Sequence, residues 1–354
     1  MTRAIAFAFA ATRVAPRLPR SGSDCETAGG GGAYRTIHLV KWRVLCVTAA
    51  LVLSAVPALG QAARTRILLD TDIGTDIDDA WALGYVLKSP TLDLLGVTVS
   101  DGDTSARARL ACKLLYRLGR TDVPVAIGRP TPAIPRDRID FQFAWAEDFQ
   151  TYKPIATPAV DFLADVIRKN PHQITLVAVG PLHNIGDLVR LHPDVIPLVK
   201  RVVLMSGSIG ANAFSAAAVS EWNVRLAIPE AQVVYSAAWP LTIVPLDSTT
   251  YVRLEDAERD ALQKARTPLT VALETLLRLW TDRPASRMTL HDQLALAEAQ
   301  EPGRFFGRCD PMPLRVDSEG YTRVDAAKGR PVGVCLEPKR DAFMAHFIAQ
   351  LSTK

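Results

Sequence analysis

Five aspartates lie within the ten-residue segment 70–79, whose letters are DTDIGTDIDD. The segment follows the apolar run 67–69, which predicts a short buried strand, and precedes residues 80–83, which predict the start of a helix. Carboxylates this close repel one another unless a cation neutralises them, and an all-oxygen ligand set favours Ca²⁺ or Mg²⁺. The segment therefore predicts a metal site in a strand-to-helix turn, where open α/β sheets bind ligands. The alternative is an acidic first turn that only stabilises the helix dipole.

Two other acid-rich motifs can be compared with this segment. An EF-hand loop counted from Asp70 would need Gly at its sixth position and Glu at its twelfth, where this chain has Thr75 and Trp81. That motif is excluded. An aspartyl-phosphate phosphatase also begins with a strand and Asp-x-Asp, but such enzymes usually carry Thr or Val at the place of Gly74. A phosphatase is therefore the weaker alternative.

Three further polar motifs occur later in the chain. The segment 177–184, VAVGPLHN, predicts a strand that enters a Gly-Pro turn. Glu221 and Asn223 are two residues apart, so in an extended segment their side chains point the same way and suit a polyhydroxylated ligand. His291 and Asp292 open an apolar helix and offer an acid/base group beside an oxygen ligand. Taken singly, these motifs are also typical of a turn, a solvated loop and a helix cap.

Strand-like and helix-like segments alternate from residue 66 onward. The predicted strands are 66–69, 94–99, 123–127, 174–179, 202–205 and 241–246. The predicted helices between them are 79–88, 105–118, 158–169, 184–191 and 229–238. After residue 254 we expect mainly helix, at 255–265 and 269–280, and then less regular structure. This pattern predicts an α/β fold with an open, mostly parallel sheet flanked by helices, Rossmann-like, and a helical C-terminal part that completes the site.

The polar motifs fall at the carboxyl ends of several predicted strands, which share one edge of a parallel sheet. With these pieces in place, residues 66 to about 350 resemble the inosine-uridine-preferring nucleoside hydrolase family. The resemblance rests on the order and spacing of five motifs: ILLDTDIG…DDA at 67–80, VAVGPLHN at 177–184, VLMSG at 203–207, EWN at 221–223 and LHD at 290–292.

The resemblance implies calcium-dependent hydrolysis of the N-glycosidic bond of ribonucleosides to free base and ribose. It places Ca²⁺ on the carboxylates of Asp72, Asp79 and Asp292 and on the backbone carbonyl of Val179. In this interpretation Asp72 also takes the proton from the attacking water, and His291 protonates or steers the departing base. The residues that the resemblance implies for substrate binding are Asp78, Asn184, Met205, Glu221 and Asn223.

The sequence departs from the family pattern at several positions. Two extra residues, one of them Asp76, separate Gly74 from the pair at 78–79. Asp103 stands where many members carry Asn, and Ala227 stands where an Asp often follows the Glu-x-Asn segment. The identity of the preferred base therefore stays open. Two other functions also stay open: an exported nucleoside- or ribose-binding protein with little turnover, and the phosphatase-type hydrolase.

The charge of the chain is unevenly distributed. Of the formal net charge of +4, residues 1–60 contribute +5 with seven Lys/Arg and two Asp/Glu, so the remaining residues sum to −1. These remaining residues therefore lack the excess of Lys and Arg that is typical of nucleic-acid-binding proteins. Its expected partner is a ribonucleoside substrate, and a homo-oligomer is possible.

The N-terminal segment predicts export. Lys41 and Arg43 precede an apolar run at 44–56, and the residues 58–60 resemble a small-x-small cleavage site. We therefore expect a leader with a signal peptide at 1–60, a hydrolase-like domain at 61–354, a periplasmic or secreted location, and no stable membrane insertion after processing. Of the five cysteines, Cys309 and Cys335 could pair after export, and Cys112 is expected in the core.

Overall fold

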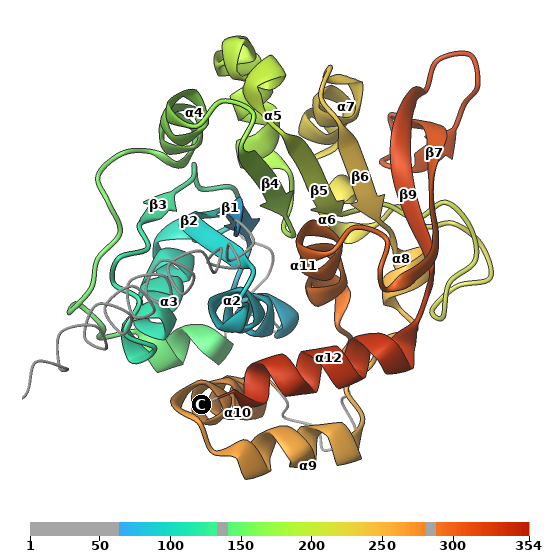
Figure 1. The fold of residues 1–354 in the computed structure, drawn as a ribbon. Coiled ribbons are helices and arrows are strands. Elements are labelled where there is room, and N and C mark those ends of the chain that lie inside the picture. The colour runs from blue at the N-terminus through green and yellow to red at the C-terminus, as the bar shows by residue number, and fades with distance from the viewer. Residues whose placement is uncertain (1–63, 133–140, 281–287, 354) are drawn as a thin grey trace, which may run out of the picture. The chain divides into compact units, whose positions relative to one another are not determined.

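The computed structural model describes residues 64–132, 141–280 and 288–353 (Figure 1). The predicted leader lies outside these residues. Strands of the described part form one nine-stranded sheet in the order β3-β2-β1-β4-β5-β6-β9-β7-β8. The pairs from β3 to β9 are parallel, whereas β7 is antiparallel to both β9 and β8. The predicted open, mostly parallel α/β sheet is confirmed.

The strands are β1 Thr65–Thr71, β2 Leu92–Val99, β3 Val125–Ile127, β4 Ile174–Ala178, β5 Arg201–Met205, β6 Leu241–Val244, β7 Phe306–Val316, β8 Thr322–Val324 and β9 Arg330–Pro338. The helices are α2 Asp78–Lys88, α3 Thr104–Arg117, α4 Ala159–Lys169, α5 His183–Leu191, α6 Trp222–Arg225, α7 Ile228–Ser236, α8 Leu246–Thr249, α9 Asp256–Ala265, α10 Pro268–Trp280, α11 His291–Gln300 and α12 Arg340–Ser352. Two short 3₁₀ helices, η2 Phe141–Ala146 and η3 Pro193–Leu198, complete the described elements.

Helices cover both faces of the sheet (Figure 1). Because successive side chains of a strand point to opposite faces, Ile67 and Leu69 of β1 belong to the core shared with α2, α3, α10, α11 and α12, whereas Leu68 belongs to the core shared with α4, α5 and α7. All three side chains are fully buried. This double burial explains why the parallel strands read as continuous apolar runs rather than as alternating ones.

The C-terminal part differs from the expectation. The less regular structure predicted after residue 280 is wrong, because β7, β8 and β9 extend the sheet there. Cys309 and Cys335 face each other across β7 and β9 and form a disulfide, while Cys112 is free and buried. The predicted helical contribution is present as well, since α8, α10 and α11 carry residues that line the cavity described below. In the part of the chain that the structure describes, no helix combines the length and apolar character that a membrane span requires.

Candidate functional site

A cavity of about 320 Å³ lies where the predicted polar motifs meet. It receives side chains from the acidic turn after β1, from the ends of β4 and β5, and from the helices α2, α6, α8, α10 and α11. Its lining residues are Asp72, Thr75, Asp76, Asp78, Asp79, Val179, Met205, Glu221, Trp222, Asn223, Leu246, Trp280, His291 and Asp292. The structure thus brings together every predicted site residue except Asn184.

Three buried aspartates converge in this cavity. Asp78 and Asp79 occupy the first turn of α2, and Asp292 occupies the first turn of α11. One carboxylate oxygen from each lies within 4.8 Å of the others. Thr71 Oγ1 donates a hydrogen bond to Asp79, whereas Asp292 Oδ2 is buried without a hydrogen-bond partner among the described residues. An unpartnered buried carboxylate oxygen in an all-oxygen group fits a hard cation such as Ca²⁺.

The pKa values of the aspartates in the cavity are consistent with a cation-binding site. Burial raises the pKa of Asp72 to about 6. Burial, reinforced by the charges of the neighbouring aspartates, also raises the pKa values of Asp78, Asp79 and Asp292 well above the ordinary range. Without a cation, the charged forms of these groups are therefore disfavoured. A bound divalent cation reverses this preference, because it favours the ionised carboxylates.

The β4–α5 turn approaches Asp72 closely. A Cβ atom placed on Gly180 would lie 2.7 Å from the backbone nitrogen of Asp72 and 2.8 Å from its Oδ1. No side chain fits at such distances, so the turn needs glycine there. The Gly-Pro motif that sequence reasoning treated as a simple turn therefore sets how close the backbone of β4 comes to Asp72.

Asn223 joins three parts of the site. Its Nδ2 donates to the carbonyl of Val179 at 2.7 Å and to the carbonyl of Met205 at 3.1 Å. The same Nδ2 lies 3.4 Å from Met205 Sδ. The Val179 carbonyl, expected as a metal ligand, thus already accepts one hydrogen bond and keeps a second lone pair for another partner.

Glu221 caps α6 and also binds the end of β5. Its Oε1 accepts from the backbone N–H of Asn223 at 2.8 Å, and its Oε2 accepts from Val224 at 3.2 Å and Gly207 at 3.0 Å. Burial raises the pKa of Glu221 even though these three backbone donors lower it. Its carboxylate is therefore fixed in orientation while it lines the cavity.

His291 lies on the cavity wall beside Thr249. Its Nδ1 is 2.7 Å from Thr249 Oγ1, and its ring meets the ring of Phe214 edge-on at 6.2 Å between centroids. Burial, together with the positive charge of Arg253, lowers the pKa of His291 to about 4. The imidazole is therefore neutral at pH 7. When the Thr249 hydroxyl donates to Nδ1, the ring proton resides on Nε2.

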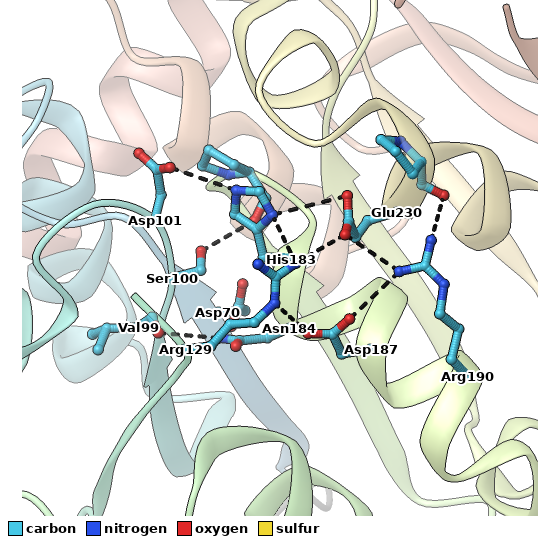
Figure 2. Close-up of polar contacts among 12 residues, drawn as sticks. Asp70, Val99, Ser100, Asp101, Arg129, His183, Asn184, Asp187, Arg190 and Glu230 are labelled. Carbon is cyan, nitrogen blue, oxygen red and sulfur yellow. Dashed lines mark hydrogen bonds and ion pairs between the residues drawn. The ribbon is translucent and has the colours of Figure 1, made fainter. Parts of the chain in front are cut away.

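Asn184 requires a correction, because it lies away from the cavity lining. Its Nδ2 donates to Asp70 Oδ2 at 2.7 Å and to the carbonyl of Val99 at 3.1 Å, and its side chain is fully buried (Figure 2). Asp70 also accepts from Thr98 Oγ1 at 2.5 Å, and burial raises its pKa to about 6. Asn184 therefore fastens the ends of β1 and β2 together, and it is not part of the ribose-binding set that we propose.

Sequence reasoning also missed residues that the structure makes important. Trp222 and Trp280 are flat aromatic residues that line the cavity, and Leu246 adds an aliphatic one, but a single apolar residue in the sequence gives no indication of a site. Asp103, which stands where many family members carry Asn, is the N-cap of α3 and accepts from the backbone N–H of Ala106 at 2.9 Å. Arg107, inside α3, contacts the acidic turn, as described below.

The fold and the cavity define an α/β protein with an acid-lined site at the carboxyl edge of a parallel sheet. The model of one family, described as "Inosine-uridine preferring nucleoside hydrolase", matches residues 67–345. The chain belongs to this family, and it is accordingly a nucleoside hydrolase, an enzyme that cleaves the N-glycosidic bond of ribonucleosides.

Individual relatives agree with this assignment. The pyrimidine-specific ribonucleoside hydrolase RihA of Enterobacter sp. (strain 638) is 31% identical over 255 residues, which are 68% of this chain and 80% of that protein. The structure of a plant nucleoside hydrolase is similar with a TM-score of 0.72 at 24% identity, covering 82% of this chain and 99% of the other. A purine-preferring ribonucleoside hydrolase from Gardnerella vaginalis gives a TM-score of 0.68 at 23% identity, covering 81% and 98%. At these identities the two structures establish the shared fold.

Proposed function

We propose that this nucleoside hydrolase is calcium-dependent and that the acid-lined cavity is its active site. The observation that carries the proposal is the convergence of the buried carboxylates of Asp78, Asp79 and Asp292 beside Asp72 in one cavity. Asp72, Asp79, Asp292 and the carbonyl of Val179 would hold the ion. When bound, Ca²⁺ supplies a positive charge that binds and orients water and the ribose hydroxyls.

The protein residues have distinct roles in this proposal. Asp72 is the general base that accepts a proton from the attacking water, and Gly180 leaves the space in which its carboxylate sits. Cleavage of an N-ribosidic bond passes through an oxocarbenium-like state, as glycoside hydrolysis does. Asp78, Glu221 and Asn223 orient the ribose, and Met205 packs against it.

His291 acts on the departing base, on the other side of the scissile N-glycosidic bond from the ribose. Its lowered pKa keeps the ring neutral, so it assists the departing base through the Nε2–H that the contact with Thr249 favours. Trp222, Trp280 and Leu246 offer apolar surfaces against which a planar base can stack. Either a purine or a pyrimidine suits such surfaces, in keeping with relatives that are named for different bases.

The experiment that tests the function is a panel of ribonucleosides incubated with the purified protein in Ca²⁺ and in chelator. Release of free base and ribose in Ca²⁺ supports the proposal, and the ranking of substrates identifies the base. Binding of nucleosides without turnover would instead support a binding protein. Release of phosphate from phosphate esters would support the phosphatase alternative. Full activity after complete removal of metal would contradict the calcium dependence.

We further propose that the protein is exported and processed near Gln61. The basic and apolar leader supports this proposal, and the Cys309–Cys335 disulfide is of a kind that persists in oxidising compartments. Mass spectrometry of the protein from its native host would find a mature N-terminus at or near Gln61. An intact leader on a cytoplasmic protein would refute this.

A further inference from the structure

A buried arginine holds the acidic turn from outside the cavity. The side chain of Arg107, in the first turns of α3, is 5% exposed. Its NH1 donates to the carbonyl of Asp72 and, at 3.2 Å, to the carbonyl of Ile73. Its Nε donates to the carbonyl of Asp101 at 2.7 Å, and its NH2 lies 3.5 Å from Asp101 Oδ2. One guanidinium thus connects the end of β1 with the end of β2.

Asp101 is itself fixed from the other side. Thr131 Oγ1 donates to Asp101 Oδ1 at 2.8 Å. Figure 2 shows His183 on another side of Asp101, with its Nε2 3.5 Å from the same oxygen. The backbone of Asp101 is left-handed, with φ 70°, a conformation that Asp and Asn tolerate better than most residues. Burial opposes ionisation, but the contacts with His183, Thr131 and Arg107 lower the pKa of Asp101. The pair of Arg107 and Asp101 is therefore ionic.

His183 links this pair to a second set of charges. Its Nδ1 lies 3.9 Å from Glu230 Oε2, and Glu230 accepts from Arg129 at 2.8 Å (Figure 2). Arg129 also pairs with Asp187 at 2.7 Å. Asp101 is thus held in a network that reaches the half-exposed Arg129, which leaves it little freedom to move away from Arg107.

The turn needs such support. Residues 72–77 lie between β1 and α2, where the ladder bonds of β1 have ended, and they carry the two extra residues and the mutually repelling acids. The backbone bond from Thr75 N to the carbonyl of Asp72 is 3.3 Å long. NH1 of Arg107 donates to both carbonyls at the start of this turn, while Nε and NH2 bind Asp101, so the guanidinium fixes the backbone from which the Asp72 carboxylate projects.

We propose that Arg107, held by Asp101, is a positioning residue that fixes the backbone of Asp72 for catalysis. The inference rests on the proposed role of Asp72 as the base. Arg107 acts through hydrogen bonds in fork geometry, which a lysine cannot reproduce. Arg107 does not line the cavity, so its loss should lower kcat far more than it raises KM.

The test compares Arg107→Gln, Arg107→Lys and Asp101→Asn with Arg201→Gln. Arg201 is the matched control, because it is also a largely buried arginine that donates to two carbonyls, those of Glu298 and Ala299, and pairs with a carboxylate. It lies at the start of β5, at the opposite edge of the sheet from the cavity. Each variant is assayed for kcat, KM, melting temperature and the Kd of Ca²⁺ measured calorimetrically.

We expect Arg107→Gln to lower kcat by about 10- to 100-fold, with KM changed less than threefold. The kcat of Arg107→Lys should decrease almost as much. The Kd of Ca²⁺ should rise in both variants, because the carboxylates are no longer held in place. Asp101→Asn keeps the left-handed backbone and the backbone carbonyl that accepts from Arg107 Nε, and it replaces only one of the two side-chain oxygens by an NH2 donor, so its decrease in kcat should be smaller. Arg201→Gln should have a lower melting temperature than the wild type but an unchanged kcat.

Other results of the same measurements would overturn the proposal. Full activity in Arg107→Lys, or tighter Ca²⁺ binding in Arg107→Gln, would show that Arg107 acts only as a charge and would overturn the proposal. Unchanged kcat in Arg107→Gln would overturn it as well. If that variant does not fold, Arg107→Lys carries the test, because it keeps the charge and the aliphatic stem. Absence of turnover in the wild type would instead contradict the proposed function, while the Ca²⁺ titrations would still report on Arg107.

Discussion

The α-carbon of Gly180 faces Asp72 so closely that an added methyl group would lie 2.8 Å from the carboxylate Oδ1. The two residues come from the ends of neighbouring parallel strands, β4 and β1. The distance between these strands, together with the missing side chain, leaves the space in which Asp72 can face the cavity.

This relationship predicts the effect of Gly180→Ala. The new methyl group would displace Asp72, so kcat should fall by about 100-fold while the protein still folds. The measurement is steady-state kinetics alongside circular dichroism. Gly119→Ala is the control, since a Cβ there would meet no atom within 4 Å and only strains a positive φ. Native kcat in Gly180→Ala would show that Asp72 tolerates displacement.

Asp72→Asn separates catalysis from folding. The variant removes the proposed base, so kcat should fall by about 10²- to 10⁴-fold. Because burial disfavours the ionised Asp72, the metal-free variant should melt at the same temperature as the metal-free wild type or above it. Asp103→Asn is the control, because asparagine caps a helix equally well. Near-native turnover in Asp72→Asn would mean that another acid is the base.

Metal removal should make stability depend on pH in a defined direction. The folded-state pKa values of Asp70 and Asp72 are raised to about 6, so the metal-free folded protein binds more protons than the unfolded chain between about pH 4 and 6. The contribution of these two groups to stability is therefore fully present below about pH 4 and is lost as the pH rises through 6. His291, with its lowered pKa, contributes the opposite slope between 4 and 6.5, but it is a single group against several acids.

Ca²⁺ should offset the part of that loss that comes from Asp72, a proposed ligand of the ion. At 100 times its Kd, the ion adds about 2.7 kcal/mol of stability, which raises the melting temperature by several degrees. Thermal unfolding in chelator and in Ca²⁺, at pH 5 and pH 8, measures both effects. A metal-free protein that becomes more stable from pH 5 to pH 8 would contradict the raised pKa values.

His291→Ala should discriminate between leaving groups. A nucleoside base departs poorly as an anion, so kcat on ribonucleosides should fall by about 100-fold or more when the assisting group is lost. A nitrophenyl riboside has a leaving group that is stable as an anion, and its cleavage should be spared. Asp292→Ala should impair both substrates, because it removes a proposed metal ligand. Equal losses on both substrates in His291→Ala would reject the role in leaving-group assistance.

Much of this site could be predicted from the sequence because the relevant residues follow buried strands. Asp72 and Val179 end neighbouring strands, and parallel strands bring their carboxyl ends to one edge. The convergence of Asp292 on that edge was implied by family resemblance, since nothing local to residue 292 indicates where α11 packs.

The failures have physical causes as well. Asn184 is the last residue of the motif at 177–184, but the start of α5 at His183 directs its side chain toward Asp70. Strand β7 contains Pro311 and Pro313 among charged residues, so its sequence lacks the apolar run of a central strand. Arg107 reads as a solvent-facing residue of an amphipathic helix, and only the tertiary structure shows which carbonyls it binds.

The two outermost strands of the sheet are its shortest. The edge strands β3 and β8 each have three residues, whereas β7 has eleven. Exposed edge strands invite pairing with another chain, and shortening them is one way in which proteins avoid fibril-like assembly. β8 pairs only with Leu314–Val316 of β7, so among the described residues no strand pairs with the outer side of 306–313. On this part of β7, the charged Arg308 and Asp310 and the prolines Pro311 and Pro313 take over the protection that a short strand gives at β8, because charge and missing N–H donors disfavour the addition of a strand from a second copy.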